Sequence, residues 1–286
     1  MTRKAGMTPF TLELAGHRVH RLGFGAMRLP TEPTAARAAS ITLLRKAVDL
    51  GVTLVDTAHL YGWGANEELV AEALHPYPDG LLVATKLGVE RRPDHADGAV
   101  YNGSEAFLRS QVDDALRRLR VERIDLMQLH RVDPAVPLAD QVGVLGDLRA
   151  EGKIGHIGLS EVSPAQLAEA RATVEIASVQ NRYNILDREY DPVVEACEAA
   201  GIAFLPWRPV VAGGAGATTV IAALARELDA TATQLALAWL LHRSPVIVPI
   251  PGTASTAHLA ENLAAARLEL TDNQYERLER AARADR

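Results

Sequence analysis

Four side chains that can hold or transfer a proton stand where short apolar stretches end. Asp56 and Tyr61 lie in the stretch LVDTAHLYG (54–62). Lys86 ends the apolar run LLVATK, and His130 ends the run IDLMQLH. Taken singly, each has an ordinary explanation: a helix cap, a rim aromatic, a surface lysine or a satisfied polar residue. Ionisable groups in apolar surroundings cost several kcal/mol unless they pair, so we expect the four to share one site.

Such a group of side chains is suited to protonating an oxygen atom. The pKa of a tyrosine hydroxyl is about 10, and a cation close by lowers that pKa by roughly 1–3. Lys86 supplies the cation, and Asp56 keeps the ammonium charged. His130 can then donate a hydrogen bond that holds a substrate oxygen against Tyr61. This arrangement protonates a developing alkoxide, and the electron pair has to come from a cofactor.

Eight apolar runs, separated by longer amphipathic stretches, have to position these side chains. This alternation is typical of repeated βα units, whose strands are apolar throughout because helices cover both faces of the sheet. The runs predict strands over residues 21–27, 52–58, 81–87, 124–130, 156–162, 177–183, 202–208 and 246–252. Eight units predict a (β/α)8 TIM barrel, in which side chains at the carboxyl ends of the strands gather on one rim. The alternative, a doubly wound sheet, usually has fewer strands and begins with a glycine-rich phosphate loop.

Further segments lie before and after the repeats. Residues 10–22 alternate apolar and polar side chains about a central Ala-Gly pair, which predicts a β-hairpin that plugs the barrel floor. Residues 261–270 and 271–284 predict two C-terminal helices. No linker or low-complexity tract divides the chain, so we expect one domain over residues 1–286.

The composition argues against several classes of partner. A formal net charge of −6 gives no general attraction to nucleic acid or anionic membrane, and no segment has the length and apolarity of a membrane span. Cys197 is the only cysteine and the first residues show no secretory signal pattern, so we expect a cytoplasmic protein. His17 and His20 have no third ligand nearby, so no metal site is predicted. Nothing in the sequence requires more than a monomer or a weak oligomer.

Motifs along nearly the whole chain resemble those of the aldo-keto reductases of the bacterial, NADPH-dependent type. They are GFGAMRL at the first predicted strand, DTAHLYG-x-G-x-NEE at the second, ATK, LMQLH, IGLS and VQNRYN at the third to sixth, and PGT with HLAEN at the eighth. The resemblance implies a barrel enzyme that reduces aldehydes and ketones with NADP(H). It places the family's catalytic tetrad on Asp56, Tyr61, Lys86 and His130, with Tyr61 as the general acid.

The resemblance also implies where the cofactor binds. It places the nicotinamide carboxamide against Ser160 and Gln180, and the stacking aromatic at Trp207. The pyrophosphate is expected over a loop of small residues that includes Gly213 and Gly214. The other expected contacts, of which the last six match the adenosine end, are Gly25, Ala26, Met27, Asp56, Arg208, Gly252, Thr253, Ser255, His258, Glu261 and Asn262.

Two departures from the family pattern bear on the cofactor. Glu161 follows Ser160 where the family usually has an asparagine, which alters the expected carboxamide contact. His258 stands where an arginine often binds the adenosine 2′-phosphate, and Gly252 where some members have lysine. A histidine is only partly charged at neutral pH and binds phosphate less well than a guanidinium. NADP(H) remains the predicted cofactor, with NAD(H) as the alternative.

A substrate pocket is expected on the same rim. Met27, His59, Trp63 and Arg131 lie near it and predict a partly aromatic pocket for a small-molecule carbonyl compound. Pyridoxal-like aldehydes, sugar aldehydes and simple aromatic aldehydes all fit this prediction.

Two other functions use some of the same residues. A lysine at a strand end suits a Schiff-base nucleophile, but Asp56 beside Lys86 keeps the amine protonated. A regulatory or sensor protein that binds NADP(H) with little turnover is the remaining alternative, because an intact tetrad does not exclude that role.

Overall fold

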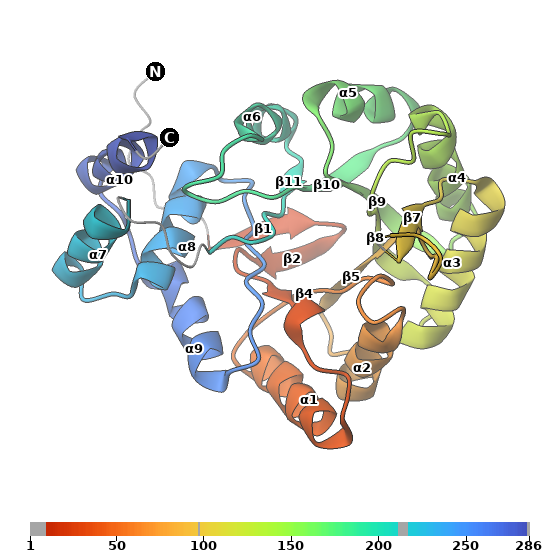
Figure 1. The fold of residues 1–286 in the computed structure, drawn as a ribbon, viewed down its shortest axis with the longest axis horizontal. Helices are drawn as coiled ribbons and strands as arrows, with labels where there is room; N and C mark the ends of the chain where they lie inside the picture. The colour runs from red at the N-terminus through yellow and green to blue at the C-terminus, as the bar shows by residue number, and fades with distance from the viewer. Residues whose placement is uncertain (1–9, 97, 211–216, 285–286) are drawn as a thin grey trace.

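A parallel β-sheet curls into a barrel in the computed structural model, which describes residues 10–96, 98–210 and 217–284 (Figure 1). Seven strands run in the order β11-β10-β9-β8-β5-β4-β3. Each overlaps a run predicted as a strand, so the expected parallel βα order is confirmed. They are β3 (Phe24–Gly25), β4 (Leu54–Asp56), β5 (Leu82–Leu87), β8 (Ile124–Leu129), β9 (Ile154–Ser160), β10 (Ile176–Gln180) and β11 (Ala203–Phe204).

The eighth predicted strand, residues 246–252, closes the barrel as an irregular segment. On one side it pairs with β11, where Phe204 donates to the Val246 carbonyl and accepts from the Val248 amide, both at 2.8 Å. The fold is therefore the expected (β/α)8 barrel, although its last strand has no regular ladder.

The other side of this segment forms a seam with the first strand. The amides of Gly23 and Gly25 donate to the carbonyls of Pro249 at 3.0 Å and Pro251 at 3.5 Å. Neither proline has an N–H group, so neither can donate a hydrogen bond across the seam. The two prolines explain why a ladder does not form here.

Helices cover the outside of the barrel (Figure 1). Their ends follow from local sequence: Ser163 caps the fifth helix by accepting from the Gln166 amide, and Gly201 ends the sixth with φ 67°. The helices after the first seven strands are α1 (Thr34–Asp49), α2 (Ala65–Leu74), α3 (Glu105–Leu119), α4 (Leu138–Ala150), α5 (Pro164–Thr173), α6 (Asp191–Ala200), α7 (Ala217–Glu227) and α8 (Ala232–Arg243).

An antiparallel hairpin, β1 (Thr11–Leu14) and β2 (His17–His20), lies across the centre of the barrel in Figure 1. Leu14 and Val19 of this hairpin are buried against inward-facing leucines of β4, β5 and β8. His17 lies 3.3 Å from Asp125, which is near the beginning of β8. The hairpin therefore closes the amino-terminal end of the barrel, as predicted.

The remaining elements include one that the sequence did not predict. A second hairpin, β6 (Val89–Arg91) and β7 (Ala99–Tyr101), follows β5 at the carboxyl-terminal end. Helix α9 (Thr256–Ala264) begins earlier than the predicted 261 and continues into a 3-10 turn, η2 (Ala265–Arg267). Helix α10 (Asp272–Ala284) agrees with the prediction. No described helix is long and apolar enough to cross a membrane.

Candidate active site

The four predicted catalytic side chains come together at the carboxyl-terminal rim of the barrel. Asp56 is the last residue of β4, Lys86 lies near the end of β5, and His130 directly follows β8. Tyr61 lies in the loop between β4 and α2. All parallel strands of a barrel end on one rim, which explains how residues from three strands meet there.

Lys86 is bound on three sides. Its Nζ donates to Asp56 Oδ1 at 2.6 Å, to the Thr57 carbonyl at 2.8 Å and to the Tyr61 hydroxyl at 3.2 Å. Burial would by itself lower the pKa of Lys86, but the negative Asp56 and the adjacent Tyr61 raise that pKa above its ordinary value. The lysine therefore stays an ammonium ion in a fully buried position.

The hydroxyl of Tyr61 does not have the lowered pKa that the sequence predicted. Burial raises the pKa of Tyr61, and this outweighs the lowering by Lys86. The prediction considered the charge of the lysine but not the loss of water around the phenol. As a result, Tyr61 is protonated at neutral pH, which is the state in which it can donate a proton.

His130 lies against Tyr61 and is neutral. The two rings pack edge to face with centroids 6.0 Å apart. Burial and then the nearby positive charges of Lys86 and Arg131 hold the pKa of His130 well below its ordinary value. His130 Nδ1 is buried without a hydrogen-bond partner among the described residues, so packing positions this ring. A neutral imidazole has one N–H, which can donate to a substrate oxygen.

The second carboxylate oxygen of Asp56 is held by two amides. Gln180 Nε2 donates to Asp56 Oδ2 at 2.9 Å, and Gln128 Nε2 donates to it at 3.1 Å. Gln128 is a positioning residue that the sequence analysis missed. The sequence feature that could have identified Gln128 is its polar side chain at an inward position of the apolar strand β8, two residues before His130.

A cavity of about 1430 Å³ opens at this rim. Asp56, Tyr61 and His130 line it, whereas Lys86 lies buried beneath. It is also lined by most of the predicted cofactor residues: Gly25, Met27, Ser160, Gln180, Trp207, Arg208, Gly252, Thr253, Ser255, His258, Glu261 and Asn262. Ala26 is buried instead, and its carbonyl accepts from an asparagine amide of α2 at 3.0 Å.

The predicted pyrophosphate loop cannot be compared with this cavity. Gly213 and Gly214 lie outside the described residues.

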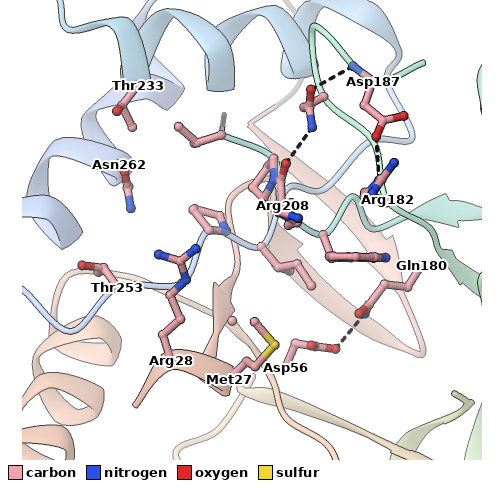
Figure 2. A pocket seen from close by; sticks show the side chains of 18 of the residues that line it. Met27, Arg28, Asp56, Gln180, Arg182, Asp187, Arg208, Thr233, Thr253 and Asn262 are labelled. Atoms are coloured by element: carbon pink, nitrogen blue, oxygen red, sulfur yellow. Dashed lines mark hydrogen bonds and ion pairs between the residues drawn. The ribbon is translucent and has the colours of Figure 1, made fainter. Parts of the chain in front are cut away.

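Two sides of the cavity are built by different parts of the chain. Figure 2 shows Asp56 and Gln180 at one end and Thr253 and Asn262 on another side of the pocket. At the latter side Ser255 caps α9, since its hydroxyl accepts from the amide of the third helical residue at 3.4 Å. Barrel strands therefore supply the first side, and the segment around Thr253 together with α9 supplies the second.

Trp207 is held by the residue that departs from the family pattern. Its indole Nε1 donates to Glu161 Oε1 at 2.7 Å, and the Arg182 amide donates to the same oxygen at 2.7 Å. The Tyr190 hydroxyl donates to Glu161 Oε2 at 3.2 Å. Ser160, just before, accepts from the Arg131 guanidinium at 3.2 Å. Glu161 is therefore turned toward Trp207, a role that the sequence did not predict.

The predicted substrate residues separate into two pairs. Met27, whose exposed fraction is 52%, and Arg131 line the cavity. His59 and Trp63 do not line it but pack edge to face with ring centroids 5.8 Å apart. Burial and then the charge of Arg118 lower the pKa of His59 to about 4, so this imidazole is neutral.

A buried ion pair behind the tetrad was also missed. Arg118 Nε on α3 donates to Glu67 Oε2 on α2 at 2.7 Å, and Thr85 Oγ1 donates to the other carboxylate oxygen at 2.5 Å. The Arg118 guanidinium also lies 3.3 Å from His59 Nδ1. Because Thr85 precedes Lys86 and His59 lies two residues before Tyr61, this ion pair ties the tyrosine loop to β5.

The loop that contacts this ion pair requires glycine at one position. Gly64 has φ 97°, and a Cβ there would lie 2.7 Å from Arg118 Cδ. The sequence pattern G-x-G after the tyrosine therefore reflects both backbone conformation and the packing of an arginine.

Several other polar residues line the cavity without having been predicted. Arg182 and Asp187 form an ion pair at 2.6 Å, and the two are drawn joined in Figure 2. Arg28 follows Met27 and also lines the cavity. These residues lie in irregular loops or next to one, so no periodic pattern in the sequence indicated them.

Comparison with known proteins identifies the family. The model of the aldo/keto reductase family matches residues 21–283. Pyridoxine 4-dehydrogenase of Escherichia coli (strain K12) is 38% identical over 287 residues, covering 97% of this chain and 100% of that protein. An uncharacterized oxidoreductase of Schizosaccharomyces pombe is 40% identical over 281 residues, covering 96% of this chain and 90% of that protein.

The fold comparison agrees with the sequence comparison. An aldo-keto reductase from Klebsiella pneumoniae, solved in complex with NADPH, superimposes with a TM-score of 0.83 at 27% identity. The superposition covers 96% of this chain and 95% of that chain. With this fold, this tetrad and these relatives, the chain belongs to the aldo/keto reductase family.

Proposed function

We propose that this oxidoreductase reduces aldehydes or ketones to alcohols with a hydride from NADPH, and that Tyr61 is the general acid. The observation that supports this most directly is the position of Lys86 Nζ, 2.6 Å from Asp56 and 3.2 Å from the Tyr61 hydroxyl. A permanently charged ammonium there stabilises the phenolate that remains after proton donation.

The cavity fits a dinucleotide together with a small substrate. Its volume of about 1430 Å³ exceeds the ~300–1,000 Å³ of ordinary small-molecule pockets. Ser160 and Gln180 would hold the carboxamide, Trp207 would stack on the nicotinamide, and Asn262 would contact the adenosine end. NADPH bound in this way supplies the hydride.

The chain's own residues carry the proton transfer. His130 donates a hydrogen bond to the carbonyl oxygen and holds it near Tyr61. As negative charge develops on that oxygen, the Tyr61 hydroxyl transfers its proton and the alcohol forms. Lys86 stabilises the phenolate, which regains a proton from solvent before the next turnover.

The substrate is proposed to be a small aldehyde, such as a pyridoxal-like or aromatic aldehyde. The cavity wall beside the tetrad includes Met27, Leu60 and Arg131, which combine apolar surface with one positive charge. A relative that is 38% identical over the full length of both proteins is named pyridoxine 4-dehydrogenase. Pyridoxal therefore comes first among the aldehydes to be tested.

The test is turnover with pyridoxal, benzaldehyde and an aldose, followed as loss of the reduced nicotinamide absorbance. We expect wild-type protein to oxidise NADPH with at least one of them. Tyr61→Phe should bind NADPH as wild type does but lower kcat by about 10²–10⁴-fold, the usual contribution of a general acid. Tight NADPH binding without turnover in the wild type would instead favour the sensor function.

A further inference from the structure

On the side of the cavity where the resemblance places the adenosine, the two positions expected to supply cations hold no lysine or arginine. Gly252 and His258 occupy the two positions where the resemblance leads one to expect lysine and arginine. Both residues line the cavity. A phosphate carries up to two negative charges and is bound best by a guanidinium or an ammonium group. NADPH binding at this side therefore requires a cation from elsewhere in the chain.

The backbone explains why residue 252 cannot supply that cation. A Cβ on Gly252 would lie 2.7 Å from the carbonyl oxygen of Gly25. In the same way, a Cβ on Gly25 would lie 2.7 Å from the Ile250 carbonyl oxygen. Contacts this close between a side chain and a backbone are not tolerated, so the seam between the first and last strands excludes a lysine at position 252.

Arg28 occupies the space beside the absent side chain. It ends the 3-10 turn η1 (Ala26–Arg28), and its Cγ lies 4.0 Å from where a Cβ on Gly252 would be. Its side chain is exposed, lines the cavity and forms no hydrogen bond or ion pair with any residue in the described ranges. Figure 2 shows its guanidinium directed into the pocket. The Arg28 guanidinium therefore offers a positive charge, unpaired among the described residues, on the side of the cavity where the adenosine end is expected.

We propose that Arg28 binds the adenosine 2′-phosphate of NADPH and makes this chain selective for NADPH over NADH. The inference rests on the proposed function for its cofactor. Arg28 would supply the positive charge that the seam excludes at position 252. His258 supplies only part of such a charge, because a histidine is only partly protonated at neutral pH. Thr253, which is buried next to Gly252, adds a hydroxyl on the same wall.

The experiment compares wild type, Arg28→Gln and Arg28→Lys by calorimetric titration with NADPH, NADH, adenosine 2′,5′-bisphosphate and adenosine 5′-phosphate. Arg28→Gln should weaken binding of NADPH and the bisphosphate by about 10- to 100-fold, the usual effect of losing a charged hydrogen bond. NADH and adenosine 5′-phosphate should bind with unchanged affinity. Arg28→Lys should keep part of the discrimination, because it keeps the charge but not the planar fork.

Arg267→Gln is the matched control, since it removes an exposed arginine of η2 that does not line the cavity. This control should leave all four affinities unchanged. Equal weakening of NADPH and NADH by Arg28→Gln would overturn the proposal, because it indicates a contact with the shared pyrophosphate or a structural role. No weakening of NADPH, or a wild type that binds NADH more tightly, would overturn it as well. Because these are binding measurements, failure of aldehyde turnover alone would reject the reductase function and leave the assignment of Arg28 standing.

Discussion

The indole of Trp207 donates a 2.7 Å hydrogen bond to Glu161, the carboxylate that stands in place of the family's usual asparagine. The Arg182 amide and the Tyr190 hydroxyl donate to the same carboxylate. Three donors from two loops thus converge on one side chain, which fixes the ring that we propose stacks on the nicotinamide. Glu161 at this position therefore holds the Trp207 indole in place.

Replacing Glu161 with alanine should weaken NADPH binding about tenfold, because the indole and amide N–H groups lose their acceptor and the ring loses its fixed orientation. Glu161→Gln keeps one acceptor oxygen, so its affinity for NADPH should fall less than that of Glu161→Ala. Titration calorimetry measures both variants. Glu175→Ala, which removes only a carboxylate of an exposed ion pair, is the control. Unchanged affinity in Glu161→Ala would show that the ring is held by packing alone.

Asp56→Asn should make turnover depend on pH in a new way. Without the carboxylate, burial lowers the pKa of Lys86, so the amine loses its proton closer to neutral pH. We expect kcat at neutral pH to fall by about 10²-fold or more, with partial recovery as the pH decreases. Asp113→Asn, at a surface ion pair with Lys153, should retain the wild-type profile. A variant with reduced kcat but no recovery at low pH would indicate a purely structural role for Asp56.

The wild-type enzyme should reduce aldehydes at a nearly constant rate from about pH 6 to about pH 9. Tyr61 has to be protonated to act as an acid, and its pKa is raised, so activity is present below that pKa and is lost above it. His130 has a lowered pKa and stays neutral throughout this window, so it adds no acid limb. The measurement is kcat/KM for reduction against pH. A loss of rate near pH 7 as the pH rises would contradict the assignment of Tyr61, and a loss near pH 7 as the pH falls would contradict that of His130.

Arg118→Met should destabilise the protein by about 3–5 kcal/mol, because it leaves the carboxylate of Glu67 buried without its charged partner. Adding Glu67→Gln to this variant should recover a large part of the loss, since the uncompensated charge is then gone. Urea unfolding followed by circular dichroism measures both variants. Arg109→Met, at exposed ion pairs, should change the free energy of unfolding by about 1 kcal/mol or less. If Arg118→Met and Arg109→Met lowered the free energy of unfolding equally, burial of the Arg118–Glu67 pair would not contribute to stability.

The sequence allowed the barrel, the rim and the tetrad to be predicted because all three depend on local patterns. Asp56, Lys86 and His130 end or follow apolar runs, and the rule for parallel strands then places them together. Ser160 and Gln180, which also line the cavity, were expected there from the family resemblance. The placement of Asp56, Lys86 and His130 needed only a strand and its end, whereas Tyr61 lies in the loop after β4.

The residues that were missed depend on contacts between distant segments. Arg118 meets Glu67 across two helices, and Arg28 faces a gap created by the approach of Gly25 to Gly252. Nothing in the neighbouring sequence reveals such partners. The pKa of Tyr61 was mispredicted for a related reason, because burial depends on the whole surroundings and not on one neighbouring charge.

At the seam between β3 and Pro249 and Pro251, the barrel wall has no regular hydrogen-bond ladder beside the cavity. Gly25 on one edge and Gly252 on the other both line that cavity, so a molecule bound against this wall can touch both edges at once. Ligand binding should therefore stiffen the wall itself, and slower hydrogen–deuterium exchange at the Gly23 and Gly25 amides would record it. Under the proposed function, the bound dinucleotide would bridge the break that the two prolines leave in the barrel wall.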